Sequence, residues 1–456
     1  MLTKLLWLNI LVSSVLLANA ANRPPSFFYS AKGKAAFVDL LSADYTVDYY
    51  VEGKKGLATS ELQFKMLEDG FPVLECDNDV IVAYIDNAKV ETEKIDLPGK
   101  VGKMTLIKKY LSKGTYNILI RNEIKKNIAF EEKGVQSSFW MSDLDRGSKG
   151  YLEKYLPTNM EYDQYKMNLK IQIQGGKAEQ IVYTNGELIS AKNDAYEISF
   201  PEYFNASSVY FHLTLKNRFV EIRDSYKSIV DGTEFPLVIY SPNKSLTEDL
   251  HKDALKILKE LEGDYGKWPH QSVVIYGIGR AWLGGMEYAG ATRTDLNALG
   301  HELHHSYFAR GVMPANGDAG WIDEAIARWR DNKYPVRKTF SAQANLGNRS
   351  PYLKTTHIKS YTHGMKFISY LASKVGGKDA LKSLLARLVD TRVFKPIQNK
   401  DFINHLETSS KANLKNLFNK HVLNIRANIQ EREKNHSIEE NPYHLPETEE
   451  FQLSTL

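Results

Sequence analysis

The segment of this 456-residue chain that most restricts its fold is His301-Glu302-Leu303-His304-His305, an H-E-x-x-H sequence. Residues four apart on an α-helix lie on one face, with Cβ atoms about 5–6 Å apart. Two imidazoles so placed can bind one zinc ion at Zn–N distances of about 2.0–2.1 Å. The glutamate after the first histidine then lies where it can hydrogen-bond a water molecule on the metal. The sequence therefore predicts a helix that supplies His301 and His305 as zinc ligands and Glu302 as a catalytic acid–base.

A third protein ligand is expected, because a catalytic zinc ion usually keeps three protein ligands and one water molecule. Glu324 follows His305 after an interval of eighteen residues, in a segment with helical character. A second helix antiparallel to the first would present this carboxylate to the same ion, which gives one zinc ion per chain. Two alternatives stay open at this point. Glu324 could be a solvated carboxylate in the first turn of a helix, and His304 could pair with His301 at a spacing of three.

The chain before residue 235 has the pattern of a β domain. Apolar side chains alternate with polar ones at Tyr116–Ile120, at Met167–Ile173 and at Tyr196–Phe200, where Pro201 ends the run. Alternation with a period of two is typical of half-buried strands, and many short strands separated by turn residues favour a sandwich or an open barrel. We therefore expect an all-β domain over residues 21–235.

Beyond about residue 240 the apolar residues recur at helical spacing. Ser245 and Glu248 form a capping-box pair before a helix that runs toward Gly263. A strand is expected at 271–276, and further helices are expected at 296–308, 322–330, 364–375, 380–388 and 413–432. The fold class predicted from these patterns is multi-domain α+β, with the β domain first and a mainly helical part after it.

The zinc motif and its surroundings resemble the aminopeptidase N family of gluzincin metallopeptidases, which includes leukotriene A4 hydrolase. The family pattern is H-E-x-x-H, eighteen residues, and then a glutamate within W-L-N-E-G-F-A. Here Trp321-Ile322-Asp323-Glu324-Ala325-Ile326-Ala327 stands at that place, with Asp323 for the family Asn and Ala325 for the family Gly. The glycyl aminopeptidase family is a close second match, because it shares the zinc pattern and a similar G-G-x-E segment.

The resemblance also assigns residues to the substrate. Gly284-Gly285-Met286-Glu287-Tyr288 is similar to the family's G-x-M-E-N, with Tyr288 in place of Asn. This resemblance implies that Gly284, Gly285 and Met286 lie along the substrate and that Glu287 binds its α-amino group.

A further similarity lies downstream, where Tyr361-Thr362-His363-Gly364 is similar to the family's Y-E-K-G. The resemblance implies that Tyr361 stabilises the oxyanion, with Tyr352 and Tyr370 as alternatives. It also implies a domain order: after the β domain, a thermolysin-like zinc-peptidase domain over 236–390, and then a helical C-terminal extension with an irregular tail over 391–456.

Residues 1–20 have the pattern of a secretory signal. Lys4 precedes an apolar stretch at Leu5–Leu17, and Ala18-Asn19-Ala20 provides small residues for cleavage. A stretch of about 13 residues is shorter than the roughly 20 that span a bilayer. We therefore expect cleavage after Ala20, a secreted or periplasmic protein, and no stable membrane insertion. A net charge of +4 over 456 residues gives no reason to expect a nucleic-acid partner.

These patterns together predict a secreted zinc metallopeptidase, most simply an aminopeptidase whose partners are peptides with a free N-terminus. One alternative is another zinc hydrolase, such as an endopeptidase of the same clan. The other is a non-catalytic secreted binding protein with a retained zinc site. A structural zinc site usually has four protein ligands and no position for water, so the predicted three-ligand set with Glu302 favours an enzyme.

Overall fold

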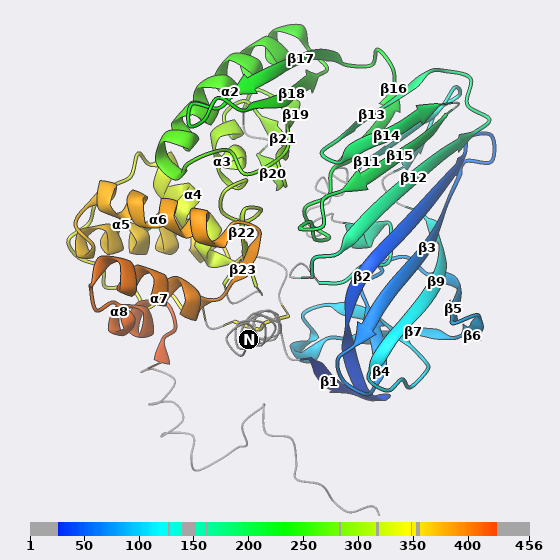
Figure 1. Ribbon diagram of the computed structural model, residues 1–456, viewed down its shortest axis with the longest axis horizontal. Helices are drawn as coiled ribbons and strands as arrows, with labels where there is room; N and C mark the ends of the chain where they lie inside the picture. Colours follow the sequence, from blue (N-terminus) through cyan, green and yellow to red (C-terminus); the bar gives the residue numbers. More distant parts are fainter. Residues whose placement is uncertain are drawn as a thin grey trace, which may run out of the picture.

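The computed structural model describes residues 26–425, except 126–127, 139–151, 161–162, 193, 282–283, 316–318, 348 and 353–355. The predicted secretory signal and the predicted irregular tail lie outside the described residues. Within them, a β-rich domain lies beside a second domain that combines a sheet with helices (Figure 1). The predicted α+β fold class is therefore confirmed. No helix in the part of the chain that the structure describes has the length and apolarity to cross a membrane.

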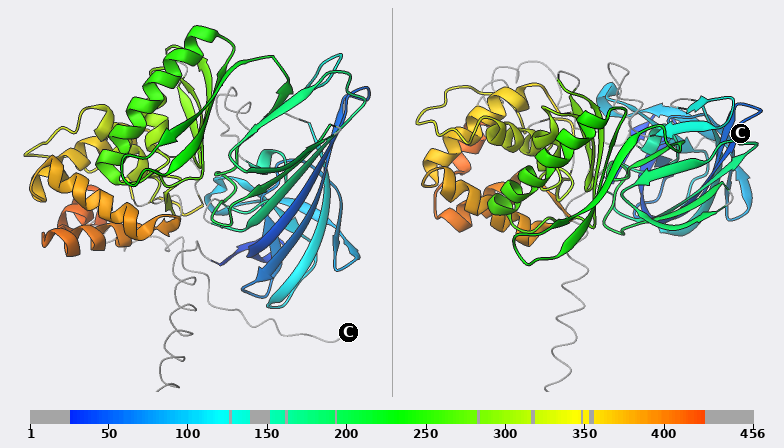
Figure 2. Two further views of the ribbon diagram at one scale, coloured as in Figure 1. Left: turned by 45° about the horizontal axis from the view of Figure 1, so that its top comes forward. Right: turned by 90° about the horizontal axis from the view of Figure 1, so that it is seen from above.

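The β domain is built on a long twisted sheet in the order β14-β15-β12-β2-β3-β9-β5-β6, and a smaller sheet in the order β10-β11-β16-β13 lies against it (Figures 1 and 2). Its strands are β1 (Phe27–Ser30), β2 (Gly33–Tyr50), β3 (Lys55–Met66), β4 (Phe71–Leu74), β5 (Val80–Ile85), β6 (Ala88–Val90), β7 (Thr92–Asp96), β8 (Lys103–Ile107), β9 (Gly114–Ile124), β10 (Ile128–Phe130), β11 (Val135–Ser138), β12 (Lys166–Gln174), β13 (Gln180–Thr184), β14 (Glu187–Lys192), β15 (Ala195–Phe200) and β16 (Phe211–Leu215).

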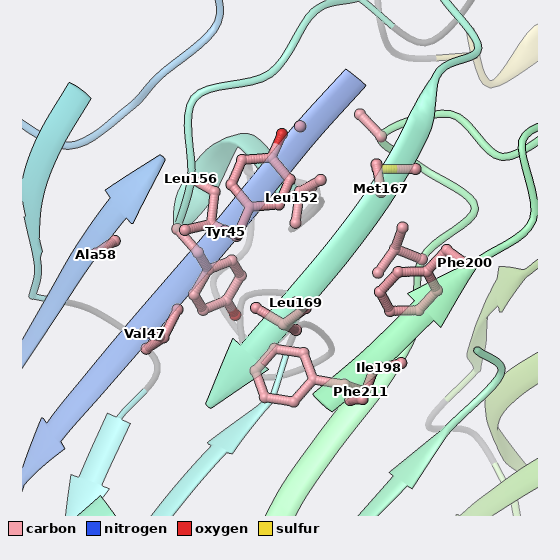
Figure 3. Packing of buried hydrophobic residues seen from close by; sticks show 14 of the residues in the cluster. Tyr45, Val47, Ala58, Leu152, Leu156, Met167, Leu169, Ile198, Phe200 and Phe211 are labelled. Atoms are coloured by element: carbon pink, nitrogen blue, oxygen red, sulfur yellow. The ribbon is translucent and has the colours of Figure 1, made fainter. Parts of the chain in front are cut away.

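The alternating residues found in the sequence form the core of this domain. On β12 and β15, Met167 pairs with Phe200 and Leu169 with Ile198, so that these four side chains share one face of the sheet. Figure 3 shows this face packed against residues of other segments, including Phe211 from the smaller sheet. Burial of each large apolar side chain contributes about 1.5–3 kcal/mol, so this face holds the two sheets together.

The second domain begins with a mixed sheet in the order β17-β18-β19-β21-β20. These strands are β17 (Val220–Lys227), β18 (Glu234–Ser241), β19 (Val273–Gly279), β20 (Gly285–Tyr288) and β21 (Ala291–Asp295). Strand β20 pairs only with β21 among the described strands, which makes it the edge of this sheet. Because β17 pairs along its length with β18, the sheet starts before the boundary placed at residue 235.

Helices cover the rest of this domain on the side away from the β domain (Figure 1). They are α2 (Lys244–Tyr265), α3 (Leu299–His304), α4 (Trp321–Asp331), α5 (Met365–Lys374), α6 (Lys378–Arg392), α7 (Asn399–Ser410) and α8 (Lys415–His421), with a π-helical turn η4 at Ser360–Gly364 and a short strand pair β22 (Val312–Pro314) and β23 (Lys395–Ile397). Their apolar faces form one core, separate from that of the β domain. The helical residues of the predicted extension at 391–456 pack into it, as Phe402 of α7 and Phe418 of α8 do.

Three local predictions were wrong. The helix expected at 413–432 ends at His421, and the other two concern α2 and α3. The N-cap of α2 is Asn243 and not Ser245: the Asn243 side chain accepts a hydrogen bond from the Leu246 backbone N–H at 3.1 Å, so the helix begins two residues earlier. The helix expected at 296–308 is only six residues long, because the backbone beyond it turns sharply. Within that turn, the N–H of Val312 bonds to the carbonyl oxygen of Tyr307 at 2.7 Å.

Candidate zinc-binding active site

Helices α3 and α4 bring the three predicted zinc ligands together. The Nε2 atoms of His301 and His305 lie 3.2 Å apart. Glu324 Oε2 lies 3.3 Å from Nε2 of His301 and 3.6 Å from Nε2 of His305. The two helices therefore present two imidazole nitrogens and one carboxylate oxygen to a common point.

This donor set fits a zinc ion. Atoms about 2.0–2.1 Å from a tetrahedral zinc ion lie roughly 3.3–3.4 Å from one another, which is close to the three separations found. Glu324 Oε2 is buried and has no hydrogen-bond partner among the described residues. A buried carboxylate oxygen without a partner is costly unless a cation neutralises it. His301, His305 and Glu324 are accordingly the residues that would hold the metal.

Hydrogen bonds on the far side of each imidazole fix its orientation. Nδ1 of His301 bonds to Oδ2 of Asp331 at 2.8 Å, and Nδ1 of His305 bonds to the backbone oxygen of Phe308 at 3.1 Å. With Nδ1 as the donor, the Nε2 lone pair of each ring is available to a metal. Sequence reasoning missed Asp331, although it lies seven residues after Glu324 and so on the same face of α4.

Replacement of Asp331 by asparagine should weaken zinc binding. The amide is a poorer acceptor than the carboxylate, so the His301 ring loses orientation and basicity. Partners of this kind typically contribute about 10–100-fold to metal affinity. Competition with a chromophoric chelator would measure the zinc dissociation constant. Arg223→Met, on exposed β17, is the control, and an unchanged affinity for Asp331→Asn would contradict this role.

Tyr361, the predicted oxyanion donor, comes from the π-helical turn η4, and its hydroxyl lies beside the three predicted zinc ligands. Its hydroxyl donates a hydrogen bond to Oε1 of Glu324. Burial and the negative charge of Glu324 raise the pKa of Tyr361, which keeps the hydroxyl protonated. Burial alone would raise the pKa of Glu324, but His305, His301 and the Tyr361 hydroxyl outweigh it and lower that pKa to about 2. Glu324 is therefore ionised, as a carboxylate that binds a cation must be.

Glu302 faces the same cleft and is almost completely buried. Burial raises the pKa of Glu302 well above its usual range; the nearby His301 opposes this shift, and the charge of Glu287 adds to it. A carboxylate with a raised pKa accepts a proton readily, as general base catalysis requires.

Gly285 makes room for the Glu302 carboxylate. A Cβ atom at position 285 would lie 2.4 Å from Cγ and 2.6 Å from Oε1 of Glu302, closer than real Cβ contacts allow. The glycine predicted to lie along the substrate thus has a second effect, because any side chain there would displace the Glu302 carboxylate.

Gly285→Ala is therefore expected to lower kcat by about 10–100-fold with zinc content unchanged, because a displacement of about 1 Å of a catalytic group can cost this much. Steady-state kinetics together with metal analysis would measure both. Gly263→Ala is a matched control, since nothing lies within 4 Å of a Cβ atom there. Full activity in Gly285→Ala would show that Glu302 does not need its present position.

A cleft of about 1070 Å³ opens over these residues. Its lining includes the predicted substrate residues Gly284, Gly285, Met286 and Glu287. Asp295 holds the start of this segment, because its Oδ2 accepts a hydrogen bond from the Gly284 backbone N–H at 2.7 Å. The structure thus brings all the predicted substrate-binding residues to the cleft that contains the candidate metal site.

The alternative residues lie elsewhere. The ring of His304 stacks on Phe308 with centroids 5.4 Å apart, in the core behind α3. Tyr352 stacks on Phe37 of the β domain, and Tyr370 stacks on Phe340. Of the three candidate tyrosines, Tyr361 is the one that lines the cleft.

Sequence reasoning missed Arg310, and it noted Asp323 only as a replacement in the motif. Arg310 follows His305 by five residues, and its Nη2 donates to Oε1 of Glu287 at 2.9 Å. Asp323, which replaces the family Asn, accepts a hydrogen bond from the Glu324 backbone N–H at 2.6 Å. Burial and the neighbouring charge of Glu324 raise the pKa of Asp323 to about 7. Both residues lie close in sequence to predicted zinc ligands, and this was the only signal available for them. Their spacing from those ligands does not indicate which residue each would bond to.

Comparison with known proteins gives matches in structure only. No protein-family model and no curated protein sequence matches this chain. Aminopeptidase A of Legionella pneumophila, in complex with aspartic acid, has a TM-score of 0.64 at 12% identity, over 84% of this chain and 49% of its own. Yeast leukotriene A4 hydrolase in complex with bestatin has a TM-score of 0.61 at 13% identity, over 85% of this chain and 68% of its own.

An M1 zinc metallopeptidase from Deinococcus radiodurans has a TM-score of 0.59 at 13% identity, over 82% of this chain and 91% of its own. This chain spans about half the length of the Legionella enzyme. Identities this low establish the fold and leave the activity to be argued from the site. The chain therefore has the fold of M1 zinc metallopeptidases and leukotriene A4 hydrolase, the family that its motifs resemble.

Proposed function

We propose that this protein is a zinc-dependent aminopeptidase that releases N-terminal residues from peptides. The observation that carries the proposal is the triangle of His301 Nε2, His305 Nε2 and Glu324 Oε2, which opens onto a cleft that also contains Glu302 and Glu287. A bound zinc ion would supply a positive charge that polarises a carbonyl group and acidifies water. The solved structures with the same fold include zinc metallopeptidases, which supports this reading.

Each residue around the metal position has a task in this proposal. Glu302 accepts the proton of the attacking water and later delivers it to the leaving amine. Tyr361, kept protonated by burial and by Glu324, donates a hydrogen bond to the oxygen that becomes negative during the attack. The buried surroundings strengthen both effects, because charges and hydrogen bonds interact more strongly away from water.

The edge strand β20 supports the assignment to aminopeptidases. An exposed sheet edge can pair with an extended peptide through backbone hydrogen bonds. Glu287 lies on this strand, and a carboxylate is the natural partner of a substrate ammonium group. A peptide anchored there by its first residue would place its first peptide bond near Glu302, so that one residue is removed at a time.

The test compares amino-acid p-nitroanilides with their N-acetylated counterparts, using protein with and without zinc. We expect zinc-dependent release from the free amines and at least about 30-fold slower release from the blocked compounds, since a buried charged contact contributes about 2–5 kcal/mol. Equal cleavage of free and blocked peptides would indicate an endopeptidase. Stoichiometric zinc without hydrolysis of any amide would indicate a binding protein with a retained zinc site.

We also propose that the protein is exported, on the basis of the signal pattern in residues 1–20 alone. Expression of the full chain followed by cell fractionation and N-terminal sequencing would test this. Export predicts a mature chain that begins at Ala21, whereas an intact Met1 in the cytosolic fraction would contradict it.

A further inference from the structure

Arg310 is a buried cation that lies directly beside the proposed ammonium anchor. Its Nη2 donates to Oε1 of Glu287 at 2.9 Å, and the side chains of Arg310 and Glu287 are 4% and 14% exposed. Its backbone N–H donates to the carbonyl oxygen of His305 at 2.9 Å. The backbone of Arg310 is therefore fixed in the turn that follows the zinc motif, and its guanidinium contacts Glu287.

The other branch of the guanidinium reaches the β domain. Nη1 of Arg310 donates to Oγ of Ser207, which lies between β15 and β16. Ser207 is itself held in place, because Oδ1 of Asn205 accepts a hydrogen bond from its backbone N–H at 3.1 Å. The planar guanidinium thus bridges a β-domain serine and the carboxylate of β20, a geometry for which arginine is suited and lysine is not.

A second contact holds β20 against the β domain at the same place. Nδ2 of Asn185 donates to the backbone oxygen of Ala289, directly after β20, at 2.7 Å, and to that of Ser208 at 2.7 Å. The end of the edge strand and the side chain of Glu287 are therefore both tied to the loop 205–208 of the β domain. The position of the anchor carboxylate depends on both domains.

We infer that Arg310 is a positioning residue that holds the Glu287 carboxylate for the substrate's ammonium group, with Ser207 extending this support to the β domain. The inference rests on the proposed aminopeptidase function. A carboxylate has about four acceptor sites on its two oxygens, so one oxygen can bind the guanidinium while the group also accepts from an ammonium. Without Arg310, the buried carboxylate loses both its orientation and its compensating charge.

The test measures substrate binding separately from turnover. For Arg310→Met, we expect KM for free-amine substrates to rise about 10–100-fold, the effect of one hydrogen bond to a charged group, with kcat changed less than about threefold. Arg310→Lys should restore part of this loss, because it returns the charge without the bridging geometry. Ser207→Ala should give a smaller rise in KM. The exposed Arg223→Met variant is the matched control.

A pair of inhibitors separates positioning from a general structural role. An amino-acid hydroxamate and its des-amino analogue bind through the same hydroxamate group and differ only in the ammonium. Arg310→Met should weaken the first about 10–100-fold and leave the second unchanged. In a Glu287→Gln background, Arg310→Met should have little further effect, because both residues act on one contact.

Three outcomes would overturn this inference. Equal weakening of both inhibitors would mean that Arg310 merely supports the fold of the site. If Arg310→Met preferred the amino compound as strongly as the wild-type protein does, Glu287 would not need Arg310 to hold its position. The proposed aminopeptidase function would then stand without this inference. If the wild-type protein itself did not distinguish the two inhibitors and cleaved no free-amine substrate, the proposed function would fail and this inference with it.

Discussion

Replacement of Glu302 by glutamine is expected to abolish most turnover while leaving the zinc content of the protein unchanged. The amide has nearly the same size and shape as the carboxylate, so the cleft keeps its packing. It cannot accept the proton of the attacking water, however, and general base catalysis typically contributes about 10²–10⁴-fold. We therefore expect kcat to fall by at least this factor, with KM changed much less.

The surroundings of Glu302 explain why no other group should replace it. The residue is 5% exposed, and its side chain lies against Gly285, so bulk water has little access. Three nearby carboxylates already have other partners. Glu324 accepts from Tyr361 and completes the donor triangle, Asp331 holds His301, and Glu287 accepts from Arg310.

The measurement combines kcat at saturating substrate with metal analysis of the same samples. Glu248→Gln is a suitable control, because Glu248 is an exposed residue of α2 that pairs only weakly with Lys244 at 3.9 Å. Turnover by Glu302→Gln near the level of the wild type would exclude the proposed mechanism. Loss of zinc from this variant would instead mean that Glu302 contributes to metal binding.

Local sequence patterns were sufficient to predict that His301, His305 and Glu324 lie together. The spacing of four between His301 and His305 places both rings on one face of α3, whatever the rest of the chain does. The interval to Glu324 allows a turn and a return along α4. The ligand geometry could therefore be predicted because helical spacing fixes the two histidines relative to each other. The only long-range assumption needed was that the second helix packs antiparallel to the first.

Contacts that depend on long-range packing could not be predicted. Arg310 reaches Glu287 and Ser207, which are separated from it by 23 and 103 residues, and neither pairing has a local pattern. The parallel pairing of β12 with β2 joins segments more than 120 residues apart for the same reason. The short α3 is another case, since the apolar spacing through Phe308 continues while hydrogen bonds such as that of Val312 to Tyr307 turn the backbone.

The proposed role of Glu287 leads to the second large effect. Glu287→Gln removes the negative charge that would bind the substrate's ammonium group and keeps the size of the side chain. Loss of one member of a buried charge pair typically costs about 2–5 kcal/mol. We therefore expect kcat/KM for free-amine substrates to fall by about 30- to 4,000-fold. This range extends above that for Arg310→Met, which leaves the anchor charge in place.

Blocked substrates provide the internal control for this variant. An N-acetylated substrate carries no ammonium, so its slow cleavage should be the same in Glu287→Gln as in the wild-type protein. The ratio of kcat/KM for free and blocked substrates, measured over a series of amino-acid p-nitroanilides, should therefore fall toward one. A uniform loss on both classes would mean that Glu287 supports the shape of β20 rather than binding the substrate. An unchanged ratio would assign the recognition of the N-terminus to another residue, because a carboxylate that binds an ammonium cannot be neutralised without changing that preference.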